Sequence, residues 1–137
     1  MVHPINASSY CRRLTFNSIV HGLFNEGLIP AGDVLDVGAN DGSTSCMLAC
    51  FDSARTVHAV DPSPLLVQRM NCRHPNMRKA NFAVADRRGL TQMRGDATYL
   101  GRLRMIDGSG NVNVTTIDDI FGTSKAGFLH IDVEGHE

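Results

Sequence analysis

The stretch DVLDVGANDG, residues 33–42, decides the fold of this chain. Residues 33–38, with Val34, Leu35 and Val37, predict a short buried strand, and residues 39–43 predict a turn before a helix that ends near Phe51. Further strands are predicted over 56–60, 80–85 and 127–133, with helical segments between them. This alternation predicts an α/β domain with a doubly wound, mostly parallel sheet.

The segments between these strands carry start and stop signals for helices. Ser63 and Pro64 supply an N-cap and a first-turn proline for a helix through about Asn71, and Thr116 begins a short helix to about Phe121. Short strands are predicted over 90–94, 102–106 and 112–116, the last two joined by residues 107–111.

An amphipathic helix is predicted ahead of the first strand, over residues 9–26, with Gly27 as its stop. We therefore expect two parts, an N-terminal helix and lead-in (1–30) and the sheet domain (31–137). The apolar fourth strand ends close to the last residue, so we expect a sheet truncated after that strand. Such a domain is expected to be marginally stable and able to self-associate through the exposed strand.

Length and composition are those of one globular domain. The chain has 137 residues, 42% of them hydrophobic, and a net charge of −1. A net charge this small does not attract nucleic acid or an anionic membrane. Because the sequence shows neither a membrane-length apolar run nor a secretory signal pattern, a cytoplasmic protein is expected. The spacing of the four cysteines (Cys11, Cys46, Cys50 and Cys72) predicts neither zinc binding nor disulfides, and Cys46 and Cys50 are expected to be reduced core thiols.

Acidic residues lie at or just after the end of each predicted main strand: Asp36, Asp61, Asp86 and Asp132. Ligands of doubly wound sheets bind at the carboxyl ends of the strands, where these carboxylates suit a ligand with hydroxyl groups and positive charge. A dinucleotide fingerprint would place glycines at positions 38, 40 and 43, and only Gly38 is present. This favours S-adenosylmethionine over NAD(P), whose oxidoreductases remain an alternative class.

Five motifs together resemble FkbM-type methyltransferases, a class I family with a Rossmann-like fold. They are DVGANDG (36–42), AVDPSP (59–64), NFAVAD (81–86), VTTIDDIF (114–121) and FLHIDVEGHE (128–137). The resemblance implies an S-adenosylmethionine-dependent enzyme that methylates a hydroxyl group of a sugar, a polyketide or a similar metabolite. A non-catalytic cofactor-binding or interaction module is the other alternative.

The resemblance also implies a cofactor site made of Asp36, Gly38, Ala39, Asn40, Asp61, Pro62, Ala85 and Asp86. Residues 38–40 would hold the methionine end with Asp36 beside it, Asp61 would bind the ribose hydroxyls, and Asp86 with Ala85 would meet the adenine edge. Asp132 would face the sulfonium and the acceptor pocket.

Methyl transfer from a sulfonium depends mainly on alignment of the reacting atoms, so no nucleophilic triad is expected. Candidate catalytic residues lie on the last strand, where alternation places Asp132 and Glu134 on one face and would add His136 if the strand continues. A metal held by these three residues is a weaker interpretation, and none is predicted. His58 and His130 are expected to be hydrogen-bonded residues of the core or of the layer around it.

Overall fold

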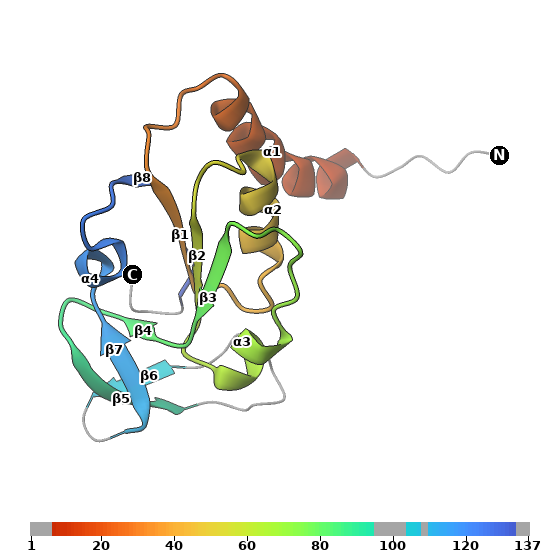
Figure 1. Ribbon diagram of the computed structural model, residues 1–137. Coiled ribbons are helices and arrows are strands. Elements are labelled where there is room, and N and C mark those ends of the chain that lie inside the picture. Colours follow the sequence, from red (N-terminus) through yellow and green to blue (C-terminus); the bar gives the residue numbers. More distant parts are fainter. Residues whose placement is uncertain (1–6, 95–103, 108–109, 134–137) are drawn as a thin grey trace. The chain divides into compact units, whose positions relative to one another are not determined.

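The computed structural model describes residues 7–94, 104–107 and 110–133 (Figure 1). The chain divides into two compact units, residues 1–30 and 31–137. The first contains helix α1 (Ala7–Asn25), close to the predicted bounds. Gly27 ends the helix at φ +67°, and the amide of Leu28 donates to the carbonyl of Leu23 at 2.9 Å, as in a Schellman motif.

The second unit is built on a parallel four-stranded sheet, which confirms the predicted α/β fold. Its strands are β1 (Asp33–Val37), β2 (Val57–Val60), β3 (Met77–Ala80) and β8 (Ala126–Ile131), in the Rossmann-like order β3-β2-β1-β8. Helices α2 (Ser43–Phe51) and α3 (Pro64–Arg69) connect the first three strands. The strand order reverses between β1 and β8, and crevices at such reversals bind ligands.

A second, smaller sheet follows β3 in the chain. It consists of β4 (Ala83–Val84), β5 (Gly89–Arg94), β6 (Arg104–Asp107) and β7 (Val112–Thr115), in the order β4-β7-β5-β6. The predicted short strands are present, but β5 lies between β6 and β7, so the two strands joined by 107–111 are not neighbours. Helix α4 (Ile117–Phe121), capped by the Thr116 hydroxyl, leads to β8.

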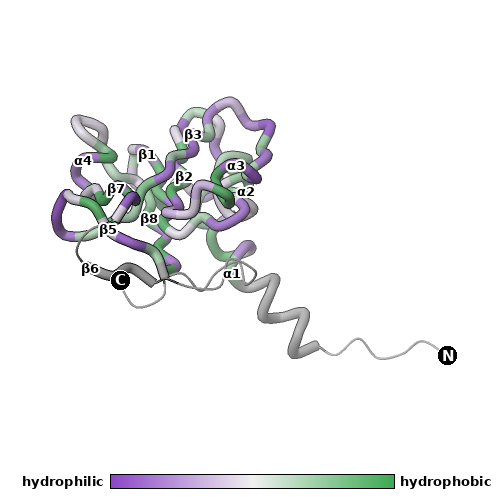
Figure 2. The backbone as a smooth tube through the Cα atoms, turned by 90° about the horizontal axis from the view of Figure 1, so that it is seen from below, coloured by the Kyte–Doolittle hydropathy of each residue, from purple (hydrophilic) through white to green (hydrophobic). Residues whose placement is uncertain are grey.

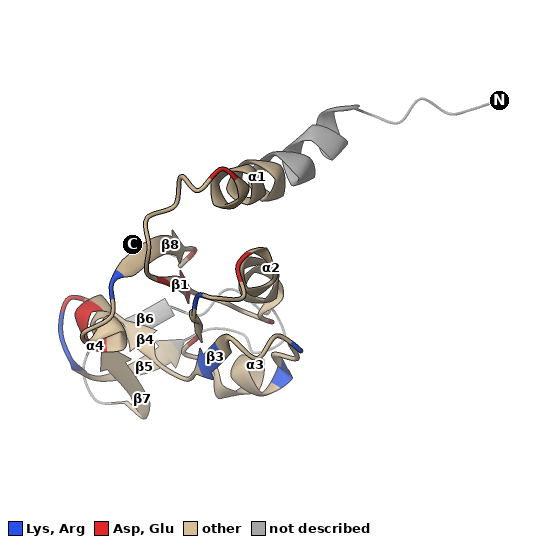
Figure 3. Cartoon of the chain, turned by 45° about the horizontal axis from the view of Figure 1, so that its top comes forward, with Lys and Arg blue, Asp and Glu red and all other residues tan. Residues whose placement is uncertain are grey.

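The prediction of a main strand over 80–85 is wrong. The third strand of the parallel sheet is β3, and residues 83–84 belong to the second sheet instead. Strand β3 lies at the edge of its sheet, and its Arg78 and Lys79 are exposed. The strand is coloured hydrophilic in Figure 2 and carries basic residues in Figure 3. Because an edge strand needs no continuous apolar run, the apolar segment just after it gave the stronger strand signal.

The parallel sheet is covered on both faces, as the doubly wound fold requires. On one face, Leu35 and Val37 pack with Phe121 of α4, and Phe82 and Val84 from around β4 join this cluster. On the other face, α2 buries Leu48 and Ala49, and Ala39 and Ala59 pack with Met70, which follows α3. At the edge opposite β3, Leu129 and Ile131 of β8 are exposed, and self-association through this strand stays a prediction.

A disulfide joins Cys46 of α2 to Cys72 in the segment after α3, with their Cα atoms 5.5 Å apart. Cys50 is a free, exposed thiol. The expectation of reduced core thiols is therefore wrong for Cys46, and Cys50 does not lie in the core; the side chain of Cys11 lies outside the described residues. The closeness of Cys46 and Cys72 comes from the packing of α2 beside the segment that leads into β3, which their spacing of 26 residues does not reveal.

Disulfides are typical of oxidising compartments, so this one weighs against the cytoplasmic expectation, which stays a prediction. Among the described residues, no helix is long and apolar enough to cross a bilayer.

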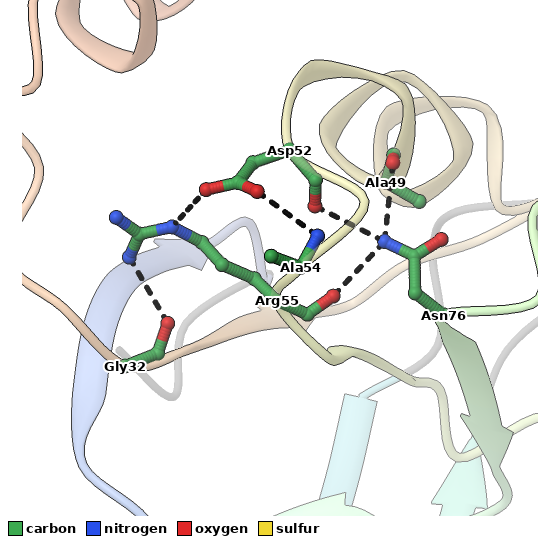
Figure 4. Close-up of polar contacts among 6 residues, drawn as sticks. All are labelled: Gly32, Ala49, Asp52, Ala54, Arg55 and Asn76. Atoms are coloured by element: carbon green, nitrogen blue, oxygen red, sulfur yellow. Dashed lines mark hydrogen bonds and ion pairs between the residues drawn. The ribbon is translucent and has the colours of Figure 1, made fainter.

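At the amino-terminal side of the parallel sheet, the side chain of Asn76 ties several segments together (Figure 4). Its Nδ2 donates to the backbone carbonyls of Ala49, Asp52 and Arg55 at 3.1, 3.2 and 2.9 Å. Arg55 in turn donates to the Asp52 carboxylate at 2.7 Å and to the carbonyl of Gly32 at 3.0 Å. The end of α2 is thus fastened to the segments that lead into β1 and β3.

Candidate functional site

A cavity of about 370 Å³ lies at the carboxyl ends of the parallel strands. It is lined by residues at and just after the carboxyl ends of β1, β2 and β8, by Thr44 of α2 and Leu66 of α3, and by Phe82, Ala83, Val84 and Met93 of the second sheet region. The volume is within the range of small-molecule sites, and the place is the reversal in strand order where such sites occur.

The turn after β1 is shaped by Gly38. Its φ is +78°, and a Cβ atom built there would lie 2.1 Å from the backbone oxygen of Asp132. The amide of Asp132 donates to the carbonyl of Val37 at 3.0 Å, so the ends of β1 and β8 are in direct contact at this point. A side chain at position 38 would separate them, which explains why the turn has glycine there.

Asp61 connects this turn to the one after β2. Its Oδ2 accepts a hydrogen bond from the amide of Asn40 at 3.0 Å, and its Oδ1 accepts one from the amide of Ser63 at 2.8 Å. Burial raises the pKa of Asp61, the charge of Asp36 raises it further, and the two amides oppose the rise. Each carboxylate oxygen keeps a further lone pair, so Asp61 is able to accept hydrogen bonds from a ligand.

Asp36 is 1% exposed and has partners on two neighbouring elements. Its Oδ2 accepts from the hydroxyl of Ser45 on α2 at 2.5 Å, and its Oδ1 lies 2.8 Å from Nδ1 of His130. His130 stands beside Asp36 in the register of β1 and β8. It is hydrogen-bonded, as predicted, and it also lines the cavity, which sequence reasoning missed.

The structure brings most of the predicted site residues to this cavity. Those that line it are Asp36, Gly38, Ala39, Asn40, Asp61, Pro62 and Asp132. Ala85 and Asp86 are not among the lining residues, because the strand that was expected to end at Asp86 belongs to the second sheet. Glu134 and His136 lie outside the described residues.

Besides His130, sequence reasoning also missed the residues contributed by the second sheet region, Phe82, Val84 and Met93. The alternation of the last strand already placed His130 on the face of Asp132. The register of β8 against β1, which local sequence does not carry, was needed to find its contact with Asp36.

Among the described residues, the charged and titratable ones that line the cavity are Asp36, Asp41, Asp61, Asp132 and His130. No lysine or arginine is among the described lining residues, so the cavity suits a ligand with hydroxyl groups and positive charge better than one with phosphates. In the part of the chain that the structure describes, no group of three or more histidine, cysteine or acidic side chains is placed to hold a metal ion.

Comparison with known proteins gives one match. A family model described as "Methyltransferase FkbM domain" matches residues 36–137, which is more than half of the chain. No curated protein and no solved structure matches the chain significantly. The matched region begins at Asp36 and includes every residue found to line the cavity.

Proposed function

Since the chain belongs to the FkbM methyltransferase family, we propose that it transfers a methyl group from S-adenosylmethionine to a hydroxyl group of a sugar, a polyketide or a similar metabolite. Membership of the family implies S-adenosylmethionine and a small-molecule acceptor. The observation that carries the proposal is the acidic cavity at the carboxyl ends of β1, β2 and β8, which contains buried Asp61 and has no lysine or arginine in its described lining.

The cavity residues fit this cofactor by their chemistry. S-adenosylmethionine has a ribose diol, a sulfonium and an ammonium group, and no phosphate. In our proposal Asp61 accepts the ribose hydroxyls and the turn at residues 38–40 holds the methionine end, where Gly38 permits close approach of the backbone. We propose that the apolar wall of Phe82 and Val84 covers the adenine base, and we do not extend the site to Ala85 and Asp86.

When bound, S-adenosylmethionine supplies an electrophilic methyl group that needs little activation. The chain then has to align the acceptor oxygen with that methyl group, and well-oriented reactants gain about 7–11 kcal/mol from proximity alone. A base that removes the hydroxyl proton adds a factor of about 10² to 10⁴ in rate. We propose Asp132, Glu134 and His136 as the candidates for this base. Asp132 lines the cavity, and the other two lie outside the described residues.

Calorimetric titration with S-adenosylmethionine, S-adenosylhomocysteine and NAD tests the cofactor assignment. We expect the first two ligands to bind and NAD not to bind. Asp61→Ala should weaken binding of the adenosyl ligands about tenfold or more, the loss expected for hydrogen bonds to a charged group. Asp86→Ala is the matched control, because Asp86 is exposed and lies outside the cavity lining, and it should leave binding unchanged.

Asp61→Asn separates loss of binding from loss of folding, because the amide side chain keeps one acceptor oxygen. Wild-type affinity in a folded Asp61→Ala variant would refute the ribose assignment, and binding of NAD alone would refute the choice of cofactor. Binding without methyl transfer to any hydroxylated acceptor would favour the non-catalytic module.

A further inference from the structure

The disulfide between Cys46 and Cys72 joins two elements that both reach the cavity. Cys46 lies in the first turn of α2, where its amide donates to the carbonyl of Gly42 at 2.8 Å. Thr44, two residues earlier, lines the cavity. Cys72 follows α3, whose Leu66 lines the same cavity. The bond therefore links the helices that follow β1 and β2 beside the site.

Met70, two residues before Cys72, supports the turn after β1 (residues 38–42). Its side chain is buried and packs with Ala39, which lines the cavity. A Cβ atom built at Gly42 would lie 3.0 Å from Cγ of Met70, so this side chain and the turn are in close contact. The turn, the start of α2, the disulfide and Met70 thus form a closed ring of contacts next to the cavity.

The segment that carries Met70 and Cys72 depends on such attachments, because residues 70–76 form neither helix nor strand. It is attached to α2 near both of its ends. The disulfide holds the end near the cavity. At the other end, on the amino-terminal side of the sheet, Nδ2 of Asn76 donates to the carbonyls of Ala49 and Asp52 at 3.1 and 3.2 Å. Loss of the disulfide would therefore loosen the end that supports the turn and leave the far end in place.

We propose that this disulfide positions the turn after β1 for the cofactor, and that its reduction weakens binding in the cavity. A dithiol such as dithiothreitol supplies two electrons and two protons: the sulfur–sulfur bond breaks, Cys46 and Cys72 become thiols, and the dithiol closes into its own disulfide. With the ring of contacts open, the turn has to be ordered when a ligand enters, which lowers the affinity. The inference rests on the proposed function, because it assumes that S-adenosyl ligands bind in this cavity.

The expected effect is moderate. On reduction, the dissociation constant of S-adenosylhomocysteine should rise about fivefold, the effect of ordering one or two more side chains on binding. The rise is limited because Met70 keeps bonds of its own backbone: its amide donates to the carbonyl of Leu66 and its carbonyl accepts from Nζ of Lys79, each at 3.1 Å. By linkage, saturating ligand should make the disulfide harder to reduce by the same factor, which corresponds to about 20 mV in reduction potential.

Calorimetric titration with S-adenosylhomocysteine compares the oxidised wild type, the wild type reduced by a phosphine, and the double variant Cys46→Ser with Cys72→Ser. The buffer contains sucrose, which favours the folded state, and circular dichroism verifies folding. The reduced wild type and the double variant should both bind more weakly than the oxidised wild type, by about fivefold.

Two controls separate positioning from other effects of the bond. Cys50→Ser removes a free, exposed thiol and should respond to reduction as the wild type does. Asn76→Ala lowers stability at the far end of the segment, so its folded form should bind with the affinity of the wild type. The reciprocal effect is measured by alkylating free thiols in dithiothreitol redox buffers, with and without S-adenosylhomocysteine.

The inference is overturned if the folded protein binds equally well in both redox states, if the ligand does not shift the thiol–disulfide equilibrium, or if Asn76→Ala loses as much affinity as reduction does. It is also overturned if the reduced protein does not fold in sucrose, because the bond would then serve folding and not the turn. If the oxidised wild type binds neither S-adenosylmethionine nor S-adenosylhomocysteine, the proposed function itself is refuted, and this inference with it.

Discussion

Reduction of the disulfide between Cys46 and Cys72 should lower the free energy of unfolding by about 3.5 kcal/mol. The two cysteines are 26 residues apart, and the loop-entropy relation for a closed loop of about that length gives this value at 25 °C. The bond acts mainly on the unfolded chain, because it keeps residues 46 and 72 together and so reduces the number of conformations that this chain is able to adopt. For a domain of this size, with an m-value near 2 kcal/mol/M, the urea midpoint should fall by about 1.7 M.

The assay is equilibrium urea unfolding with and without a phosphine reductant, followed by far-UV circular dichroism. We expect the wild type to lose stability on reduction and Cys72→Ser to unfold at the lower midpoint under both conditions. Cys50→Ser is the matched control, because Cys50 is a free thiol and its removal should leave the effect of reduction intact. If the wild-type midpoint does not respond to reductant, or if Cys50→Ser abolishes the response, the assignment of the disulfide is wrong.

Three further predictions concern single positions. Asn76→Asp places a carboxylate against three backbone carbonyl oxygens and should lower the unfolding free energy by about 3 kcal/mol or more in thermal melts. The control is Asn71→Asp at an exposed position, which should change that free energy by less than about 0.5 kcal/mol. Gly38→Ala forces a Cβ atom against the backbone oxygen of Asp132, just after β8, at φ +78°, and should abolish adenosyl binding in calorimetry even where the variant folds. The Arg88 guanidinium holds the pKa of Asp119 below its usual value. The stabilisation by this ion pair is therefore present above about pH 4 and is lost as the pH falls. In chemical unfolding, the unfolding free energies of Arg88→Gln and wild type should differ at neutral pH and converge in acid.

The parallel sheet was predictable from sequence where its strands are buried. Residues 33–38 and 56–60 are short segments rich in valine and other apolar residues, with turn residues after them, and β1 and β2 lie there almost residue for residue. Strand β3 was misplaced because its exposed Arg78 and Lys79 contribute no apolar signal, and its position depends on pairing with β2. Local patterns report burial, whereas edge strands are set by contacts made across the sheet.

In the candidate site, too, local sequence predicted some residues, whereas others depend on contacts between distant parts of the chain. Asp36, Gly38 and Asp61 were found because they lie at or directly after the ends of buried strands, so their place at the carboxyl edge comes from the topology. The contact of His130 with Asp36 depends on strand register, and the wall formed by Phe82 depends on how a second sheet packs against the first. Neither contact leaves a trace in the neighbouring sequence.

Asp61 spans the turns after β1 and β2 before any ligand arrives, because the amides of Asn40 and Ser63 already hold both of its oxygens. The two loops are therefore braced in advance, and a ligand has little backbone to order when it enters. Pre-organised sites of this kind lose little entropy on association and adjust their affinity mainly through the rate of ligand escape. Variants that loosen this brace should thus release the ligand faster while capturing it at nearly the same rate.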